Sequence, residues 1–233
     1  MTQRITPHSS DAGFFMRRKF NVVGRPLVWT EHRSKLTAIT WQDVPTLKGI
    51  YNITIKLDGK FVRIVKKGTT IRMISSGGLD FYHNKLAELL MHFPNGQYNM
   101  ELIHGDGLLK SRDHTGYLTT ACTEYRNQDS TCGEWPEGND LRFVVHDYLE
   151  PNFEVGGYRL ETEYLMRWSA IMGAFLSHGP INGDLLRLPM SMKYRASSHD
   201  AYQLLRGRLA VELGYDPAVH EGLVFQELNA PYR

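Results

Sequence analysis

The segment Lys56-Leu57-Asp58-Gly59 places a candidate nucleophile at the end of a predicted strand. A lysine fixed at the end of a buried strand can have its pKa lowered by burial and by nearby cations, and the neutral amine is then a nucleophile. Asp58 lies two residues farther on, so both side chains leave the strand on the same face. Taken alone, so short a pattern also fits a hairpin with an exposed lysine.

Two glutamates stand in otherwise apolar strand sequences. Glu101 lies within Asn99-Met100-Glu101-Leu102-Ile103, and Glu221 opens the run Glu221-Gly222-Leu223-Val224. A carboxylate buried in such a strand requires a cation, a metal ion or a sugar hydroxyl as its partner. Each glutamate could instead be a solvated residue, since glutamate is mostly exposed in proteins.

A strand sequence rich in aromatic residues lies between the two glutamates, Phe143-Val144-Val145-His146-Asp147-Tyr148. The flat rings of such a strand can stack on a nucleobase. In isolation, packing of the aromatic side chains into a core explains the same pattern.

The elements that must position these residues follow from the spacing of apolar residues. The predicted strands are 51–56, 61–66, 70–75, 98–104, 141–148, 186–194 and 222–225. The predicted helices are 85–92, about 160–178 and 198–213, and the Gly-, Asp- and Thr-rich stretch 105–140 is predicted to form hairpins and loops. Groups of hairpin strands with inserted helices indicate an α+β fold.

The composition is that of a globular chain that can bury a core, with 233 residues, 42% of them hydrophobic and 22% charged. No run of 18 apolar residues and no apolar leader occurs, which argues against a membrane span and a secretory signal. Cys122 and Cys132 form neither a disulfide framework nor a zinc pattern. We therefore expect a cytoplasmic protein, in a bacterial cell or in a host cell if the sequence is phage-derived.

The charge is divided unevenly along the chain. Residues 1–75 carry 14 Lys and Arg against 4 Asp and Glu, although the whole chain has a net charge of only +2. A basic N-terminal third suggests an anionic partner such as a polyphosphate or a nucleic acid. A solvated basic face without a ligand would give the same count.

The order of the motifs is more specific than any one of them. Lys-x-Asp-Gly, then Glu-Leu, then an aromatic–Asp strand, then Glu-Gly-Leu-Val resembles the covalent nucleotidyltransferase superfamily of polynucleotide ligases and mRNA capping enzymes. Gly105 to Leu109 also resembles the DNA ligase branch, particularly small phage-type ATP-dependent enzymes. The resemblance spans roughly residues 45–233. It implies an α+β nucleotidyltransferase (ATP-grasp-like) domain at 36–233, after a basic arm at 1–35, with antiparallel sheets flanked by helices around a nucleotide cleft.

The resemblance implies ATP and Mg²⁺ as cofactors and a reaction in three steps. Lys56 attacks the α-phosphorus of ATP to form lysyl–AMP, AMP passes to the 5′-phosphate of a nicked duplex, and a 3′-hydroxyl displaces it. Lys56 and Asp58 are then the catalytic residues. Glu221 and Glu101 are the expected metal ligands, and Glu101 is also a candidate ribose contact.

The same resemblance implies a set of nucleotide-binding residues. The aromatic strand is expected to supply the ring that faces adenine, and both Phe143 and His146 are candidates for it. The full set is Lys56, Ile55, Arg63, Glu101, Phe143 and His146.

The sequence departs from the family pattern at two places. Phe61 stands where family members usually carry an arginine; Arg63, on the same strand face, could substitute, or the contact is absent. The chain also reaches Arg233 before the family's fifth motif, a Lys-x-Lys strand, and before its OB-fold domain.

Several interpretations therefore stay open. The chain could be a truncated piece, one subunit of a split ligase with a second chain supplying the OB-fold domain, or a ligase-like protein without full activity. A DNA ligase is the leading interpretation. An RNA ligase and a non-catalytic nucleic-acid-binding subunit are the alternatives. A capping-type guanylyltransferase is less favoured, and use of NAD in place of ATP stays open.

Overall fold

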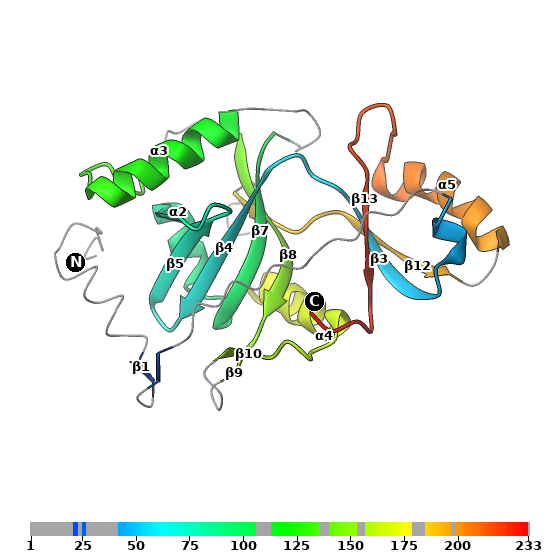
Figure 1. Cartoon of the computed structure of the whole chain (residues 1–233), viewed down its shortest axis with the longest axis horizontal. Helices are drawn as coiled ribbons and strands as arrows, with labels where there is room; N and C mark the ends of the chain where they lie inside the picture. The colour runs from blue at the N-terminus through cyan, green and yellow to red at the C-terminus, as the bar shows by residue number, and fades with distance from the viewer. Residues whose placement is uncertain are drawn as a thin grey trace.

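The computed structural model describes residues 21–22, 25–26, 42–105, 113–135, 140–152, 157–178, 185–196 and 199–232. Within these residues the chain forms two main sheets with helices packed against them, and two short two-stranded pairs, which confirms the predicted α+β fold (Figure 1). The predicted basic arm at 1–35 lies outside the described residues apart from β1 (Asn21–Val22) and β2 (Arg25–Pro26), which pair antiparallel. None of the described helices has the length and hydropathy needed to cross a membrane.

The larger sheet has six strands in the order β11-β8-β7-β4-β5-β6. All neighbours are antiparallel except β11 and β8, which are parallel. The strands are β4 (Lys60–Lys67), β5 (Thr70–Ser75), β6 (Asp80–Phe81), β7 (Gly96–His104), β8 (Leu141–Leu149) and β11 (Leu186–Arg187). A short antiparallel pair, β9 (Pro151–Asn152) and β10 (Gly157–Tyr158), follows β8.

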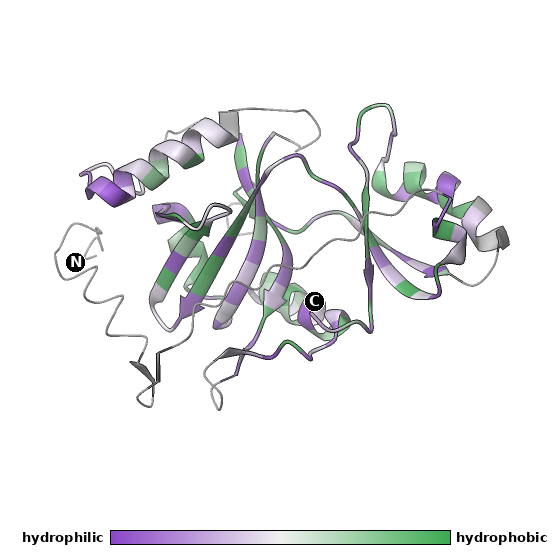
Figure 2. Ribbon diagram, in the orientation of Figure 1, coloured by the Kyte–Doolittle hydropathy of each residue, from purple (hydrophilic) through white to green (hydrophobic). Residues whose placement is uncertain are grey.

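The smaller sheet has three strands in the order β12-β3-β13. Its central strand β3 (Gly49–Ile55) pairs antiparallel with β12 (Ser191–Ala196) on one side and with β13 (Leu223–Glu227) on the other. Hydrophobic and hydrophilic residues alternate along the strands of both sheets (Figure 2), as expected for strands with one face in a core.

Each sheet has its own core. The face of the larger sheet that carries Val62, Met100 and Val145 packs against α2 (Asn84–Leu90), α3 (Asp113–Asn127) and α4 (Tyr164–His178). The smaller sheet packs against α5 (His199–Leu213) and the 3-10 helix η1 (Val44–Thr46).

Helix α3 corrects the prediction of hairpins and loops for 105–140. The helix is rich in threonine and has few apolar positions, so its sequence resembles a loop. Leu118, Ala121 and Cys122, at helical spacing, nevertheless reach the core. The hydroxyls of Thr119 and Thr123 donate to carbonyls four residues earlier, which satisfies them within the helix.

The predicted strand 186–194 is interrupted in the structure. It divides into β11, which pairs with β8 of the larger sheet, and β12, which pairs with β3 of the smaller sheet. Pro189 lies in the break between them. Because proline cannot donate to a strand ladder, it fits the point at which the chain leaves one sheet for the other.

A buried histidine begins helix α2. His83 is 5% exposed, and its Nδ1 accepts a hydrogen bond from the backbone N–H of Leu86 at 3.3 Å. Its ring lies 4.8 Å from the ring of Trp135 and 5.5 Å from that of Phe143. Burial lowers the pKa of His83 to about 4, so the imidazole is neutral at pH 7.

The low pKa of His83 predicts acid sensitivity of the fold. Because the folded pKa lies below the unfolded value of 6.5, neutral His83 stabilises the fold above pH 6.5, and this stability is lost as pH falls from 6.5 to 4. Between pH 7 and pH 5 the loss is about 2 kcal/mol. His83→Asn keeps a capping acceptor without a titrating group. Urea unfolding at both pH values should show a smaller pH dependence in this variant; an equal dependence would contradict the assignment.

Candidate active site

A pocket of about 340 Å³ lies between the two sheets. The residues from the larger sheet that line it are Phe61, Asn99, Glu101, His146 and Asp147. Those from the smaller sheet are Thr54, Ile55, Val224 and Gln226. The connecting segments supply Lys56, Leu57, Ser76, Pro189 and Tyr232.

Lys56 and Glu221 meet at one end of the pocket. Leu223 is paired with Ile55, and the next contact along the two strands is a hydrogen bond from the backbone N–H of Lys56 to the carbonyl of Gly222 at 2.9 Å. This register brings Lys56 Nζ to 2.5 Å from Glu221 Oε2. Both side chains are close to half exposed, at 42% and 49%, so the pair is accessible to a ligand.

Glu101 lies beside this ion pair, in the middle of the larger sheet. It is paired with Phe61 of β4. Its carboxylate interacts electrostatically with Lys56, Asp58 and Glu221. Burial raises the pKa of Glu101 to about 7, Lys56 acts to lower it, and Asp58 acts to raise it. A cation bound here would favour the ionised carboxylate.

Glycine is required at position 59 because the backbone there passes very close to β7. A Cβ added at Gly59 would lie 2.5 Å from the carbonyl oxygen of Leu102 and 2.6 Å from Cγ of Glu101. Only glycine therefore lets the chain pass this close to β7, where Glu101 is placed next to Lys56.

A β-bulge decides which ring of β8 faces the pocket. Asn99 is paired with Asp147 and Met100 with Val145, so His146 is the extra residue of β8 and has no partner on β7. His146 lines the pocket, 5.9 Å from the ring of Phe61. Burial lowers its pKa to about 4, so the ring is neutral at pH 7.

Phe143 corrects one half of the aromatic prediction. Its side chain is fully buried in the core between the larger sheet and the helices, and it is not among the residues that line the pocket. Of the two candidate rings, the structure places only His146 where a base could contact it.

The two remaining predicted nucleotide contacts have different positions. Ile55 lines the pocket and also packs against the core of the smaller sheet. Arg63 is 3% exposed, is not among the pocket residues, and lies close enough to Tyr158 to affect its pKa. The expectation that Arg63 substitutes for the family arginine therefore has no support in the geometry.

Several pocket residues were not predicted. Asn99 lies two positions before Glu101, and Gln226 lies two positions after Val224, so period-two alternation from those residues could have found both. Asp147 required knowledge of the bulge, and Tyr232 had no local signal.

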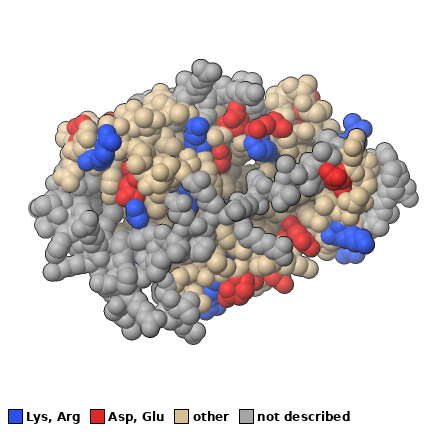
Figure 3. Space-filling model, in the orientation of Figure 1, with Lys and Arg blue, Asp and Glu red and all other residues tan. Residues whose placement is uncertain are grey.

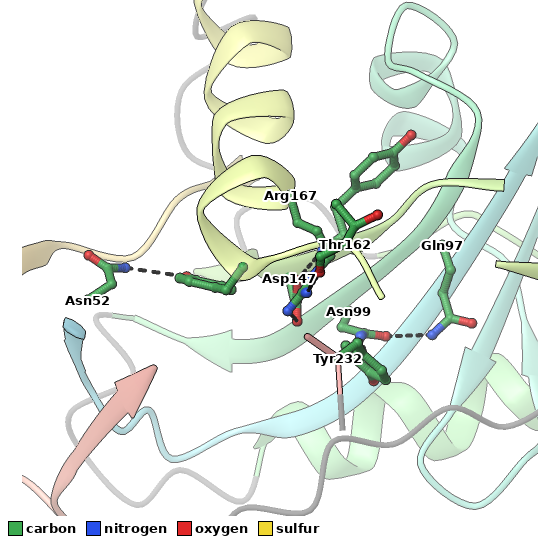
Figure 4. A network of polar contacts seen from close by, with 9 residues as sticks. Asn52, Gln97, Asn99, Asp147, Thr162, Arg167 and Tyr232 are labelled. Carbon is green, nitrogen blue, oxygen red and sulfur yellow. Dashed lines mark hydrogen bonds and ion pairs between the residues drawn. The ribbon is translucent and has the colours of Figure 1, made fainter. Parts of the chain in front are cut away.

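The far end of the pocket contains a buried polar network (Figure 4). The guanidinium of Arg167 donates two hydrogen bonds to the Asp147 carboxylate, at 2.8 and 3.1 Å, and both side chains are 4% exposed. Burial raises the pKa of Asp147, and the bonds from Arg167 act against this rise. Arg167 also donates to the carbonyl of Thr162 and lies 5.4 Å from the ring centre of Tyr232.

The charged side chains of the described residues form no separate metal-binding cluster. Acidic and basic side chains are interspersed on the face shown in Figure 3. Among the described residues, no group of three or more His, Cys, Asp and Glu side chains is arranged to hold a metal ion by itself.

Comparisons with solved structures identify the fold. The structure named Pmar-Lig_Pre superposes with a TM-score of 0.59, at 15% identity, over 87% of this chain and 44% of that chain. The Chlorella virus DNA ligase-adenylate superposes with a TM-score of 0.52, at 15% identity, over 85% of this chain and 61% of that chain. The chain thus has the fold of ligase nucleotidyltransferase domains and spans about half the length of these two proteins.

Sequence comparisons add nothing to this identification. No protein-family model matches the sequence, and no curated protein matches it.

The Asp147–Arg167 pair predicts a large effect of removing one partner. Arg167→Met leaves a buried carboxylate unpaired and should lower the free energy of unfolding by about 3–5 kcal/mol. Arg208→Met, which breaks the exposed pair with Glu212 on α5, is the control and should change the free energy of unfolding far less than Arg167→Met does. Equal effects in urea unfolding would contradict the role given to the buried pair.

Proposed function

We propose that this chain is the adenylation domain of an ATP-dependent DNA ligase. The observation that carries the proposal is the contact of the pocket residue Lys56 with Glu221, with Glu101 beside it. These three residues lie far apart in the sequence; Lys56 and Glu101 line the pocket, and Glu221 adjoins it through its contact with Lys56.

Lys56 is the nucleophile in this proposal. Its Nζ attacks the α-phosphorus of ATP, a nitrogen–phosphorus bond forms, and the bond from that phosphorus to the leaving oxygen of pyrophosphate breaks. The ammonium must first leave its ion pair with Glu221, 2.5 Å away, and lose a proton to water, which can reach it because both side chains are close to half exposed. The negative charge of Asp58 acts on the neighbouring carboxylate of Glu101 and raises its pKa.

The rest of the pocket supports a bound nucleoside. With phosphates at Lys56, the nucleoside extends between Val224 of the smaller sheet and the His146 and Phe61 rings of the larger sheet. A neutral His146 ring provides a flat surface without a charge. The neighbour named as a DNA ligase-adenylate has the same fold, which favours AMP as the group transferred.

The carboxylates fit a Mg²⁺ ion that ATP brings with it. Mg²⁺ is usually bound by one or two carboxylates together with substrate phosphates, so a cage of three protein ligands is not required. Glu221 and Glu101 are the residues that would hold it, and the raised pKa of Glu101 marks a site that gains from a nearby cation. When bound, the ion supplies stabilisation of the negative charge on the phosphate oxygens.

We propose nicked duplex DNA as the polynucleotide. The support is the fold shared with the Chlorella virus DNA ligase-adenylate, at a TM-score of 0.52. AMP passes from Lys56 to the 5′-phosphate at the nick, and the 3′-hydroxyl then displaces it. Because the chain matches only 44% and 61% of the two neighbours, the sealing assay should also include an OB-fold chain supplied in trans.

Covalent labelling tests the proposed nucleophile. Incubation with α-labelled ATP and Mg²⁺, followed by denaturation, should leave an acid-labile label on the wild-type chain. Lys56→Ala should remove the label completely because the bonding nitrogen is gone. Lys48→Ala, which removes an exposed lysine just before β3, should be labelled like the wild type.

The same experiment can contradict the proposal. A wild-type chain that takes no label, even with the OB-fold chain present, would favour a non-catalytic nucleic-acid-binding protein. If label appears, transfer to nicked DNA is compared with transfer to nicked RNA. Faster transfer to RNA would replace DNA ligase with RNA ligase as the function.

Glu221 predicts the metal dependence of labelling. Glu221→Gln keeps a hydrogen-bond acceptor for Lys56 but removes the charge, so labelling should need about tenfold more Mg²⁺ to reach half its maximal rate. Glu212→Gln on α5 is the matched control and should leave the Mg²⁺ titration unchanged. An identical titration curve for Glu221→Gln would refute the metal assignment.

A further inference from the structure

The strands give the pocket a direction. Going away from Lys56 along β3 leads to Thr54, going away from Glu221 along β13 leads to Gln226, and going away from Glu101 along β7 leads to Asn99. Lys56 and Thr54 are two residues apart, as are Glu101 and Asn99, so each of these two pairs spans about 7 Å along its strand, and Gln226 lies five residues beyond Glu221. Lys56, Glu101 and Glu221 thus lie toward one end, and Asn99, Gln226 and the paired Asp147 lie toward the other.

Tyr232 lies at the end remote from Lys56. Its side chain is 8% exposed and lines the pocket together with Asn99 and Asp147. The Nδ2 of Asn99 donates to the Tyr232 hydroxyl at 3.0 Å, and the Nε2 of Gln97 donates to Asn99 Oδ1 at 2.8 Å. Figure 4 shows Tyr232 against Asn99, with Arg167 and Asp147 nearby.

The backbone that carries Tyr232 is fixed by hydrogen bonds to helix α4. The carbonyls of Ala230 and Leu228 accept from the N–H groups of Tyr164 and Leu165, at 2.9 and 2.8 Å. These are N–H groups of the first turn, which have no partner inside a helix. The N–H of Tyr232 in turn donates to the carbonyl of Leu160 at 2.8 Å. A side chain fixed on both its backbone and its hydroxyl cannot easily move away from a ligand.

We propose that Tyr232 closes the base end of the pocket and limits which purines fit, an inference that rests on the proposed nucleotide site. With the phosphates at Lys56 and the ribose next to them, the base edge farthest from the ribose points to the remote end. In adenine that edge carries the 6-amino group. The Tyr232 ring therefore excludes adenine nucleotides with a bulky substituent on that amine.

The test widens the pocket and supplies the matching ligand. Wild type, Tyr232→Ala and Tyr232→Leu are compared for binding of ATP and of N6-benzyl-ATP by calorimetry, and for labelling by each nucleotide. The wild type should prefer ATP, and both variants should lower this preference by about tenfold or more. Tyr232→Leu keeps an apolar side chain in the cluster with Val65 and Leu149, so the test does not depend on the alanine variant folding.

Tyr158→Leu is the matched control, because Tyr158 belongs to the same apolar cluster but does not line the pocket. It should keep the wild-type preference. If the Tyr232 variants fold and bind ATP but still reject N6-benzyl-ATP, the inference about Tyr232 is overturned and the ligase proposal is not affected. A wild type that binds ATP without becoming labelled overturns the ligase proposal but leaves Tyr232 testable by binding. A wild type that binds no adenine nucleotide overturns both.

Discussion

The register between β3 and β13 is the constraint on which the candidate site depends. Leu223 opposite Ile55, followed by the hydrogen bond from Lys56 to Gly222, places the Lys56 side chain against that of Glu221. A slip of one residue would turn Val224 and Gln226 from the pocket to the core of the smaller sheet. Because Ile53, Tyr51 and Phe225 fill that core, the apolar packing enforces the register that the chemistry needs.

The sequence predicted the charged end of the site because its signals are local. A carboxylate inside an apolar strand and a glycine directly after a strand are visible in a few residues, and Gly59 proves to be required by the approach of β7. The choice between Phe143 and His146 could not be made in this way. Alternation along β8 changes at the bulge, and the bulge exists only in the pairing with β7.

The helices and strands differ in how closely they agree with the sequence prediction. Strands such as 60–67 and 70–75 have strong β-branched patterns and agree closely with the prediction. Helix α3 does not agree with the prediction, because only a few of its side chains meet the core and its exposed face is rich in threonine, as in a loop. The contribution of Tyr232 likewise depends on contacts with Asn99 and α4, more than sixty residues away in the chain, which no local pattern records.

The break at Pro189 is one of the points where the chain joins the two sheets. In the described part of the chain, the backbone passes between the two sheets at Lys56–Gly59, at the Pro189 break and at Leu228–Tyr232, and each passage supplies residues to the pocket wall. Three segments of the described chain therefore join the two sheets beside the pocket. Lys56, Pro189 and Tyr232 therefore lie both in the pocket wall and at the points where the chain joins the two sheets. A molecule that enters or leaves the pocket can do so past Lys56 and Glu221, whose side chains are close to half exposed.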